Sequence, residues 1–579
     1  MEDTKKRIAI LGGGPSGLFM YKRLVKSGRT DIEIEIFERK QQLGAGMPYS
    51  AEGANKEHIT NVSGNEIPTI VTSIHEWICS VDKEILKPYD ITPLNFNDYK
   101  VLPRLLFGKY LEAQFDLLKY MAREAGISTV MHLGIQVTDV IDKPDLNKVL
   151  VEFEGSAIEE FDLAIICTGH NWPKKHEGKV EGYFDSPYPP AKLELKLNHP
   201  VAIKGSSLTA IDAIRTLARK NGSFKEDANG ILHFEPAPGS ENFKMVMHSR
   251  NGLLPAVRFH LEDSHLQNSS LLTPEAIEQH KSANGGFLSL DFIFEKDFKD
   301  LFKYKDPEFY ARIKDVSIEH FVEDMMHYRE NASPFDLLRL EYAEADRSIK
   351  KHESVYWKES LAVLSFAMNY PAKYFSAEDM LRLQKVLMPL ISIVIAFVPQ
   401  TSCKELLALH DAGRLDIVLV GQDSDVEIND TGGITYHYTD DTGDELSNRY
   451  KTFVDCVGQP HLLFEEFPFK SMLDNGTISK AILKFQSGNE GSKAQASGNK
   501  KVKQNKEGYY LEVPGITIND NFEVIDTNGK ANKRIYIMAV PYIGGFNPDY
   551  SGLDFGEEAS MHIIRSIITG NEVPMVDVK

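Results

Sequence analysis

The sequence predicts an α/β protein with two Rossmann-like, three-layer dinucleotide-binding lobes and a helical insert. Two stretches carry this prediction, because each joins an apolar strand, a glycine-containing turn and an amphipathic helix. The first is "RIAILGGGPSGLFMYKRL" from Arg7, and the second is "VAIKGSSLTAIDAIRTLA" from Val201. Between residues 261 and 404 the chain is charged, aromatic and without strand periodicity, which predicts a set of helices.

Length and composition indicate a chain of more than one lobe. With 579 residues the protein is too long for one ordinary core, and 42% hydrophobic with 26% charged residues is typical of soluble globular proteins. The net charge of −19 disfavours nucleic acid and anionic membranes as partners. Four scattered cysteines without a C-x-x-C pair, and a start that leads directly into a strand, favour a cytoplasmic protein. The longest apolar run, "VLMPLISIVIAFV", is too short for a membrane span and predicts a buried helix or strand.

The first unit predicts a dinucleotide site. Gly12, Gly14 and Gly17 satisfy the spacing G-x-G-x-x-G between a strand and a helix, with Ser16 in the same turn. The first glycine allows a sharp turn, the second lets the backbone approach a pyrophosphate, and the third lets helix and strand pack closely. Glu38 ends the next strand, where a carboxylate can accept hydrogen bonds from ribose hydroxyls. The alternative is a glycine turn that serves packing alone.

The chain resembles the two-dinucleotide-binding flavoproteins, in which the N-terminal unit holds the ADP half of FAD. "FERK" after the second strand is similar to the Glu-Arg or Glu-Lys pair of that family, which implies that Arg39 joins Glu38 at the cofactor. "FDLAIICTGH" resembles the second motif of the family and implies a cofactor role for Asp162, Thr168 and Gly169.

A closer resemblance is to FAD/NAD(P)-binding proteins related to bacterial lysine and ornithine N-monooxygenases and to a bacterial FAD-dependent urate hydroxylase. The matching stretches are "LGAGMPYS", "HITNV", "PRLLFGKYL", "GSSLTAIDA", "SRNGLLPAVR" and "VDCVGQP". The resemblance implies a cofactor contact for Arg104, whose alternative is a salt bridge at a helix N-terminus. It also implies that Asp554 in "YSGLDFGEE" meets the flavin, although Leu553 interrupts the Gly-Asp pair of the family.

The second unit predicts a weaker nucleotide site. Its G-x-S-x-x-A spacing, which begins at Gly205, replaces the middle glycine by Ser207 and fits an exchangeable occupant. The hydroxyls of Ser206, Ser207 and Thr209 can donate to a pyrophosphate. The following strand is succeeded by Arg250 rather than by an acid, and a cation there suits a 2′-phosphate, so we expect NADPH rather than NADH. The alternative is a degenerate unit without a ligand.

Two nucleotide sites let a mobile hydride donor visit a resident acceptor, so the sequence predicts an NADPH-dependent FAD oxidoreductase. The missing cysteine pair argues against the disulfide reductases of this superfamily, and the histidines show no spacing typical of a metal site. The resemblance implies a monooxygenase that hydroxylates a small molecule through a flavin hydroperoxide, with molecular oxygen as co-substrate. A flavin reductase or dehydrogenase without oxygen insertion and a non-catalytic flavin sensor are the alternatives.

Few residues can be assigned to the chemistry itself. His170, Tyr49 and Asn547 lie in stretches that resemble flavin loops of the family, and each has an alternative as a structural hydrogen-bonding group. We expect an FAD lobe from residues 1–198 and 451–579, with a mobile polar loop at 488–508. We expect an NADPH lobe from 199–260 and 405–450, and a helical insert at 261–404 that serves as a substrate cap.

Overall fold

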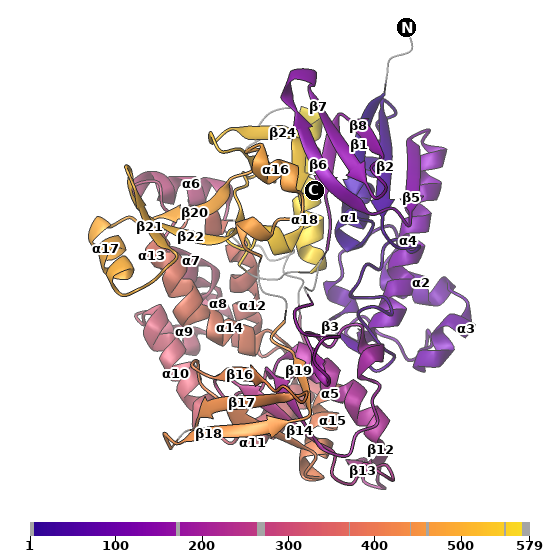
Figure 1. Ribbon diagram of the computed structural model, residues 1–579, viewed down its shortest axis with the longest axis vertical. Helices are drawn as coiled ribbons and strands as arrows, with labels where there is room; N and C mark the ends of the chain where they lie inside the picture. The colour runs from indigo at the N-terminus through magenta and orange to yellow at the C-terminus, as the bar shows by residue number, and fades with distance from the viewer. Residues whose placement is uncertain are drawn as a thin grey trace.

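The computed structural model describes residues 5–169, 174–262, 272–369, 371–440, 442–458, 462–548 and 552–569. Two sheets of mainly parallel strands form its frame, one in the upper part of Figure 1 and the other at the lower end. The helices of the middle region lie along the side of both, on the left of the view. This arrangement confirms the predicted α/β fold with two dinucleotide-binding-type lobes and a helical insert.

The first sheet has the strand order β23-β24-β9-β1-β2-β5, and only the β23–β24 pair is antiparallel. Its strands are β1 (Lys6–Leu11), β2 (Ile32–Glu38), β5 (Ser128–Leu133), β9 (Leu163–Ile166), β23 (Glu523–Ile525) and β24 (Ala531–Ile537). Segments far apart in the sequence therefore build one sheet, in which the first and last strands of the chain are separated by β9 alone.

Helices cover one face of this sheet, and a small antiparallel sheet covers the other. The three helices are α1 (Pro15–Lys26), α4 (Arg104–Glu124) and α18 (Leu553–Thr569), and α1 packs against both of the others. The antiparallel strands are β6 (Val137–Lys143), β7 (Lys148–Phe153) and β8 (Ile158–Phe161). Phe37 of β2 stacks on Phe153 with ring centroids 4.5 Å apart, so the two sheets share one core.

The second sheet has the order β10-β19-β11-β14-β15 and is parallel throughout. Its strands are β10 (Tyr183–Phe184), β11 (Pro200–Lys204), β14 (Lys244–Ser249), β15 (Leu415–Leu419) and β19 (Thr452–Asp455). β10 and β19 lie outside the segments that we expected for this lobe, because β19 pairs with β11 over residues 201–204 before the chain returns to the first lobe.

The second lobe repeats the layers of the first. Helices α5 (Leu208–Asn221) and α15 (Gln400–Asp411) pack together on one side. Strands β16 (Asp425–Ile428), β17 (Ile434–Thr439) and β18 (Glu445–Tyr450) form an antiparallel sheet on the other, where Tyr436 stacks on His248 at 4.0 Å. A hairpin of β12 (Gly222–Glu226) and β13 (Leu232–Pro236) follows α5 and accounts for the extra length before Arg250.

The insert is helical, as expected. Its helices are α6 (Pro274–Ala283), α7 (Leu290–Asp297), α8 (Phe302–Lys305), α9 (Pro307–Ile313), α10 (Ile318–Glu330), α11 (Pro334–Lys351), α12 (Tyr356–Met368), α13 (Ala377–Arg382) and α14 (Met388–Val394). Several begin at a side chain that caps the first turn, such as Ser289, Ser317 and Ser376. The apolar run from Val386 contains the whole of α14, and most of the buried side chains of this helix belong to the same hydrophobic core as those of the first lobe.

Short elements complete the chain. They are β3 (Ile59–Ser63), β4 (Val101–Pro103), α2 (Ile74–Ser80), α3 (Lys83–Leu86), α16 (Lys470–Asp474), α17 (Gly488–Ala496), β20 (Lys480–Lys484), β21 (Val502–Asn505) and β22 (Gly508–Ile516). The expected loop at 488–508 was therefore wrong: Ser487 caps a helix there, Gly491 packs on the Tyr509 side chain, and β21 pairs with β22.

Two further observations concern the described part of the chain. None of its helices combines the length and apolar character needed to cross a membrane. Within the same residues, no cluster of three or more His, Cys, Asp or Glu side chains is placed to hold a metal ion.

Candidate functional site

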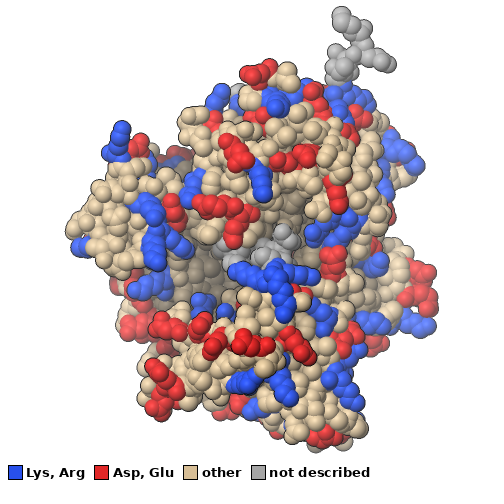
Figure 2. Space-filling view, viewed as in Figure 1, with Lys and Arg blue, Asp and Glu red and all other residues tan. Residues whose placement is uncertain are grey.

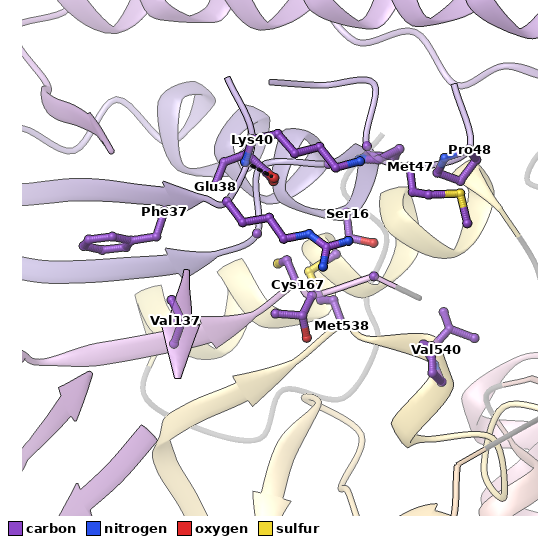
Figure 3. Close-up of a pocket in the computed structure, with 18 of the residues that line it drawn as sticks. Ser16, Phe37, Glu38, Lys40, Met47, Pro48, Val137, Cys167, Met538 and Val540 are labelled. Atoms are coloured by element: carbon purple, nitrogen blue, oxygen red, sulfur yellow. Dashed lines mark hydrogen bonds between the residues drawn. The ribbon is translucent and has the colours of Figure 1, made fainter. Parts of the chain in front are cut away.

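A cavity of about 360 Å³ lies where β1, β2 and β9 end, which is where parallel sheets bind ligands. Figure 3 shows its walls, which combine the glycine turn after β1, the end of β2 and the end of β9. The structure brings together eight of the residues expected to contact the cofactor or take part in the chemistry: Gly12, Gly14, Ser16, Glu38, Arg39, Tyr49, Thr168 and Gly169.

The glycine turn has no room for side chains at two positions. Gly12 has a φ of +113°, and a Cβ atom there would lie 2.6 Å from the carbonyl oxygen of Cys167. Gly17 does not line the cavity, and a Cβ atom on it would lie 2.1 Å from the carbonyl oxygen of Gly12. The first and third glycines are therefore required by packing, whereas Gly14 faces Gly46 across the cavity wall.

The N-terminus of α1 opens onto this cavity. Gly14 is the N-cap and contributes no side chain, and Pro15 occupies the first turn. The free backbone N–H groups and partial positive charge of such a helix end attract phosphate. Arg39, an exposed cation on the cavity wall, adds to this potential. On the face shown in Figure 2, Lys and Arg side chains gather beside a hollow in the middle of an otherwise acidic molecule.

Glu38 is held across the glycine turn. One carboxylate oxygen accepts a hydrogen bond of 2.8 Å from the N–H of Gly13, and the other accepts one of 3.0 Å from the N–H of Lys40. Each oxygen has a second lone pair, so the carboxylate can also accept from hydroxyl groups inside the cavity. With only 8% of its surface exposed, Glu38 has one orientation and serves as a fixed acceptor.

Other predicted residues lie in different places. Asp162 precedes β9 and is at the opposite end of the sheet, where it accepts a bond of 2.8 Å from the N–H of Arg7. Asn547 is buried and does not line the cavity. Tyr49 lines it, packs edge-on against Phe107 at 4.8 Å, and remains a neutral phenol because burial raises its pKa. His170 lies outside the described residues.

Arg104, expected to contact the cofactor, does not line the cavity. Its guanidinium forms an ion pair of 2.5 Å with Asp212 of α5, which belongs to the second lobe. The salt bridge that we had kept as the alternative is thus present, and it joins the two lobes.

Asp554 lies in the first turn of α18, between the cavity-lining residues Leu553 and Phe555, but its own side chain is turned away from the cavity. Its Oδ1 atom is buried and has no hydrogen-bond partner among the residues that the structure describes. Burial, together with the nearby carboxylates of Glu66 and Glu558, raises the pKa of Asp554 to about 7.

The second unit has the same backbone turn as the first. Gly205 has a φ of +103°, and a Cβ atom there would lie 3.0 Å from the carbonyl oxygen of Cys456 at the end of β19. This contact corresponds to that between Gly12 and Cys167. Ser207 is the exposed N-cap of α5 and makes no side-chain cap bond, so its hydroxyl and the first-turn amides are open to a ligand.

Two other predicted residues of this unit differ in their surroundings. The Ser206 hydroxyl donates a bond of 2.8 Å to the carbonyl oxygen of Leu253 and lies 3.0 Å from the Ser249 hydroxyl, so it braces the loop after β14. Arg250 follows β14, the neighbour of β11, and is exposed. Thr209 is half-buried in the first turn of α5.

Several cavity residues were missed in the sequence. They are Ile135, Gln136 and Val137 before and in β6, Pro468 and Phe469 before α16, and Met538, Val540, Pro541 and Tyr542 after β24. No local spacing distinguishes these residues, because they reach the cavity only through the pairing of β24 with β9 and the packing of β6 and α16 beside the first sheet. Gly46, Met47 and Pro48 lie in "LGAGMPYS", a stretch that the resemblance had already indicated.

Comparison with known proteins matches two regions to family models. Residues 9–171 match an FAD-NAD(P)-binding family, and residues 273–395 match the YdhS-like middle domain. Uncharacterized protein YdhS from Escherichia coli (strain K12) is 30% identical over 474 residues, which cover 81% of this chain and 86% of that protein. The chain belongs to the YdhS family. As a member with an FAD-NAD(P)-binding domain, it has the cofactors FAD and NAD(P), in agreement with the prediction.

More distant relatives match a smaller part of the YdhS-family chain. Flavin-containing monooxygenase 5 from Cavia porcellus is 26% identical over 174 residues, 29% of this chain and 28% of that protein. Trimethylamine monooxygenase from Roseovarius sp. (strain 217) is 27% identical over 179 residues, 29% of this chain and 36% of that protein. Among solved structures, Kutzneria sp. 744 ornithine N-hydroxylase has a TM-score of 0.48 at 12% identity, over 97% of this chain and 99% of that one.

Proposed function

We propose that this protein is an NADPH-dependent FAD monooxygenase that hydroxylates a small molecule. The observation that carries the proposal is the pair of strand–glycine–helix units, one opening onto a cavity and the other presenting an exposed helix N-terminus. A tightly held redox group and an exchangeable hydride donor need these two kinds of site. The coarser statement, a flavoprotein oxidoreductase, follows from the family and its FAD-NAD(P)-binding domain.

The cavity residues fit the ADP part of FAD. The open amides at the start of α1 suit the pyrophosphate, and Glu38 presents acceptors to the ribose hydroxyls. Arg39 adds a positive charge at the wall. Bound FAD would supply the exchange of electrons with NADPH and oxygen. The protein chain would bind and orient the cofactors and the substrate, and would exclude water from them.

The second unit fits NADPH in its exposed features. Ser207 and Thr209 present hydroxyls at the start of α5, where a pyrophosphate would meet the helix dipole. Arg250 stands at the end of the neighbouring strand, where its fork of donors suits a 2′-phosphate. The Ser206 hydroxyl is not part of the proposed NADPH contacts, because it donates a hydrogen bond to the Leu253 carbonyl and so stabilises the loop after β14.

The partial matches to flavin-containing and trimethylamine monooxygenases favour oxygen insertion over simple electron transfer. The insert 273–395, matched by the YdhS-like middle domain, shares a continuous core with the first lobe and is the segment that we assign to the substrate. The substrate is a small molecule, to be identified by screening.

The test uses purified full-length protein. We expect bound FAD that NADPH bleaches faster than NADH under nitrogen, and substrate-stimulated NADPH consumption in air across a panel of amines, amino acids and purines. In ¹⁸O₂ the product should gain one labelled oxygen atom for each NADPH oxidised. A product without label, with all oxygen recovered as hydrogen peroxide, would indicate a reductase instead. Protein that contains no flavin and binds none when it is added would refute the proposal.

A further inference from the structure

Two buried arginine–carboxylate pairs cross between the lobes in opposite directions. Arg104, at the start of α4 in the first lobe, pairs with Asp212 of α5 in the second. Arg258, in the segment after β14, pairs with Glu66, which follows β3 in the first lobe, and donates a bond of 2.8 Å to the Ser63 hydroxyl. The side chains of Arg258 and Glu66 are 5% and 4% exposed, so this contact is fully enclosed.

The Arg104–Asp212 pair belongs to a larger network on α5. The Tyr188 hydroxyl donates a bond of 2.7 Å to the Asp212 carboxylate, and Arg104 Nε donates one of 3.2 Å to the carbonyl oxygen of Ile59. His58 Nε2 lies 3.1 Å from both the carbonyl oxygen of Asp212 and the hydroxyl of Thr216. His58 and Arg104 of the first lobe therefore contact α5 along one full turn, from Asp212 to Thr216.

Both members of the pair remain charged. Burial alone would raise the pKa of the Asp212 carboxyl, but the Arg104 guanidinium, together with His58 and the hydrogen bond from Tyr188, outweighs burial and holds that pKa below its usual value. Burial would lower the pKa of the Arg104 guanidinium, but Asp212 and Tyr188 together raise that pKa above its usual value. A charged pair enclosed in this way tolerates little displacement, because separating the partners would leave an unpaired charge inside the protein.

The network lies between the two proposed cofactor sites. Asp212 is five residues from Ser207, the N-cap at which the pyrophosphate would bind, and a helix rises only about 8 Å over that length. On the other side, Arg104 begins α4, and Phe107 of that helix packs against Tyr49, which lines the cavity of the first lobe. A rigid helix and one ion pair thus join the phosphate-binding end of the second unit to the wall of the first.

We infer that Arg104 and Asp212 are positioning residues that fix α5 against the first lobe, so that a nicotinamide held by the second unit meets the flavin in one orientation. The inference rests on the proposed function. It predicts that weakening the pair slows hydride transfer at saturating NADPH and leaves NADPH affinity nearly unchanged, because the phosphate-binding groups themselves are intact.

The experiment compares holoproteins of the wild type, Asp212→Asn and the control Asp430→Asn, an exposed residue of the same lobe. Stopped-flow absorbance under nitrogen gives the limiting rate of flavin reduction and its dependence on NADPH concentration, and dithionite reduction reports on the flavin alone. We expect Asp212→Asn to lower the limiting rate about 10- to 100-fold, with little change in the half-saturating concentration and an unchanged dithionite reaction. Tyr188→Phe, which removes one bond to Asp212 and keeps the ring, should lower the rate about two- to fivefold.

Amide hydrogen exchange of the apoproteins adds a readout that is independent of activity. Exchange at residues 57–60 and 208–216 should be faster in Asp212→Asn than in the wild type and unchanged in Asp430→Asn. Wild-type limiting rates in both Asp212→Asn and Tyr188→Phe would overturn the positioning role and leave the proposed function standing. Wild-type protein that dithionite reduces and NADPH does not would refute the proposed function, and the positioning role with it.

Discussion

The two nucleotide-binding units share one backbone fold and differ in the side chains at and around their glycine turns. In both, a glycine with positive φ lies against the end of a neighbouring strand, and a small antiparallel sheet covers the face opposite the helix. The first turn continues with Gly14 and is faced by the fixed carboxylate of Glu38. The second continues with Ser207 and is followed by Arg250. The difference shows that one backbone frame can carry different side chains at its ligand-facing turn, and under the proposed function these side chains separate a resident from a visiting ligand.

The largest expected contrast is between Gly12→Ala and Gly205→Ala. The new Cβ atom would lie 2.6 Å from backbone at position 12 and 3.0 Å at position 205, and both positions have positive φ. We expect Gly12→Ala to purify without flavin and to lose roughly 2–4 kcal/mol of unfolding free energy. Gly205→Ala should lose less stability and keep its flavin. Flavin absorbance per protein and urea unfolding measure both effects, and equal losses in the two variants would break the comparison.

The next contrast concerns the residue at the end of the second parallel strand of each unit, which is Glu38 in the first unit and Arg250 in the second. Arg250→Ser should lower the preference for NADPH over NADH roughly 10- to 100-fold, because a charge-assisted contact to the 2′-phosphate is lost, without affecting bound flavin. Steady-state kcat/KM for both nucleotides checks this. Arg312→Ser, an exposed position in the insert, is the matched control and should leave the preference unchanged. If Arg250→Ser kept the wild-type preference for NADPH, the proposed contact between Arg250 and the 2′-phosphate would be contradicted.

The pKa values of Asp212 on α5 and Asp554 on α18 are shifted in opposite directions. The pKa of Asp212 is lowered by Arg104, whereas burial and neighbouring carboxylates raise that of Asp554 from 3.8 to about 7. Folded protein therefore holds the Asp554 proton more tightly than unfolded protein, so its contribution to stability is present near pH 4 and lost as the pH rises through about 7. Asp554→Asn should make the apoprotein more stable than the wild type at pH 8, by on the order of 2 kcal/mol.

The measurement for Asp554 is urea unfolding of both apoproteins at pH 5 and pH 8. The difference between them should be smaller at the lower pH, where the wild-type carboxyl is protonated. Asp145→Asn, in an exposed turn of the first lobe, controls for the change of residue type. A variant that loses stability equally at both pH values would contradict the raised pKa.

The smallest expected effect concerns the brace in the second turn. Ser206→Ala removes the hydroxyl bond to the Leu253 carbonyl, which should weaken NADPH binding about two- to fivefold through a looser loop. Titration of flavin reduction against NADPH concentration measures it. A drop as large as that of Arg250→Ser would show that Ser206 contacts the nucleotide directly, and the two units would then be more alike than the structure indicates.

Local patterns and the family resemblance predicted several short pieces of the site, although these pieces lie far apart in the sequence. The glycine spacing, Glu38 at the end of β2 and Thr168-Gly169 after β9 all meet in one cavity. The cofactor contact expected of Arg104 stays a prediction, and its ion pair with Asp212 could not be predicted because that partner comes from the other lobe. The polar composition of segment 488–508 predicts a loop, because composition alone does not reveal the capped helix α17 or the pairing of β21 with β22.

The sequence by itself determined the two strand–turn–helix units and the helical insert, because apolar periodicity and glycine placement act through neighbouring residues. Only the tertiary structure decided which distant segments close the cavity, that β19 joins the second sheet, and that buried ion pairs tie α5 to the first lobe. These features depend on packing between residues hundreds of positions apart, for which local spacing carries no signal.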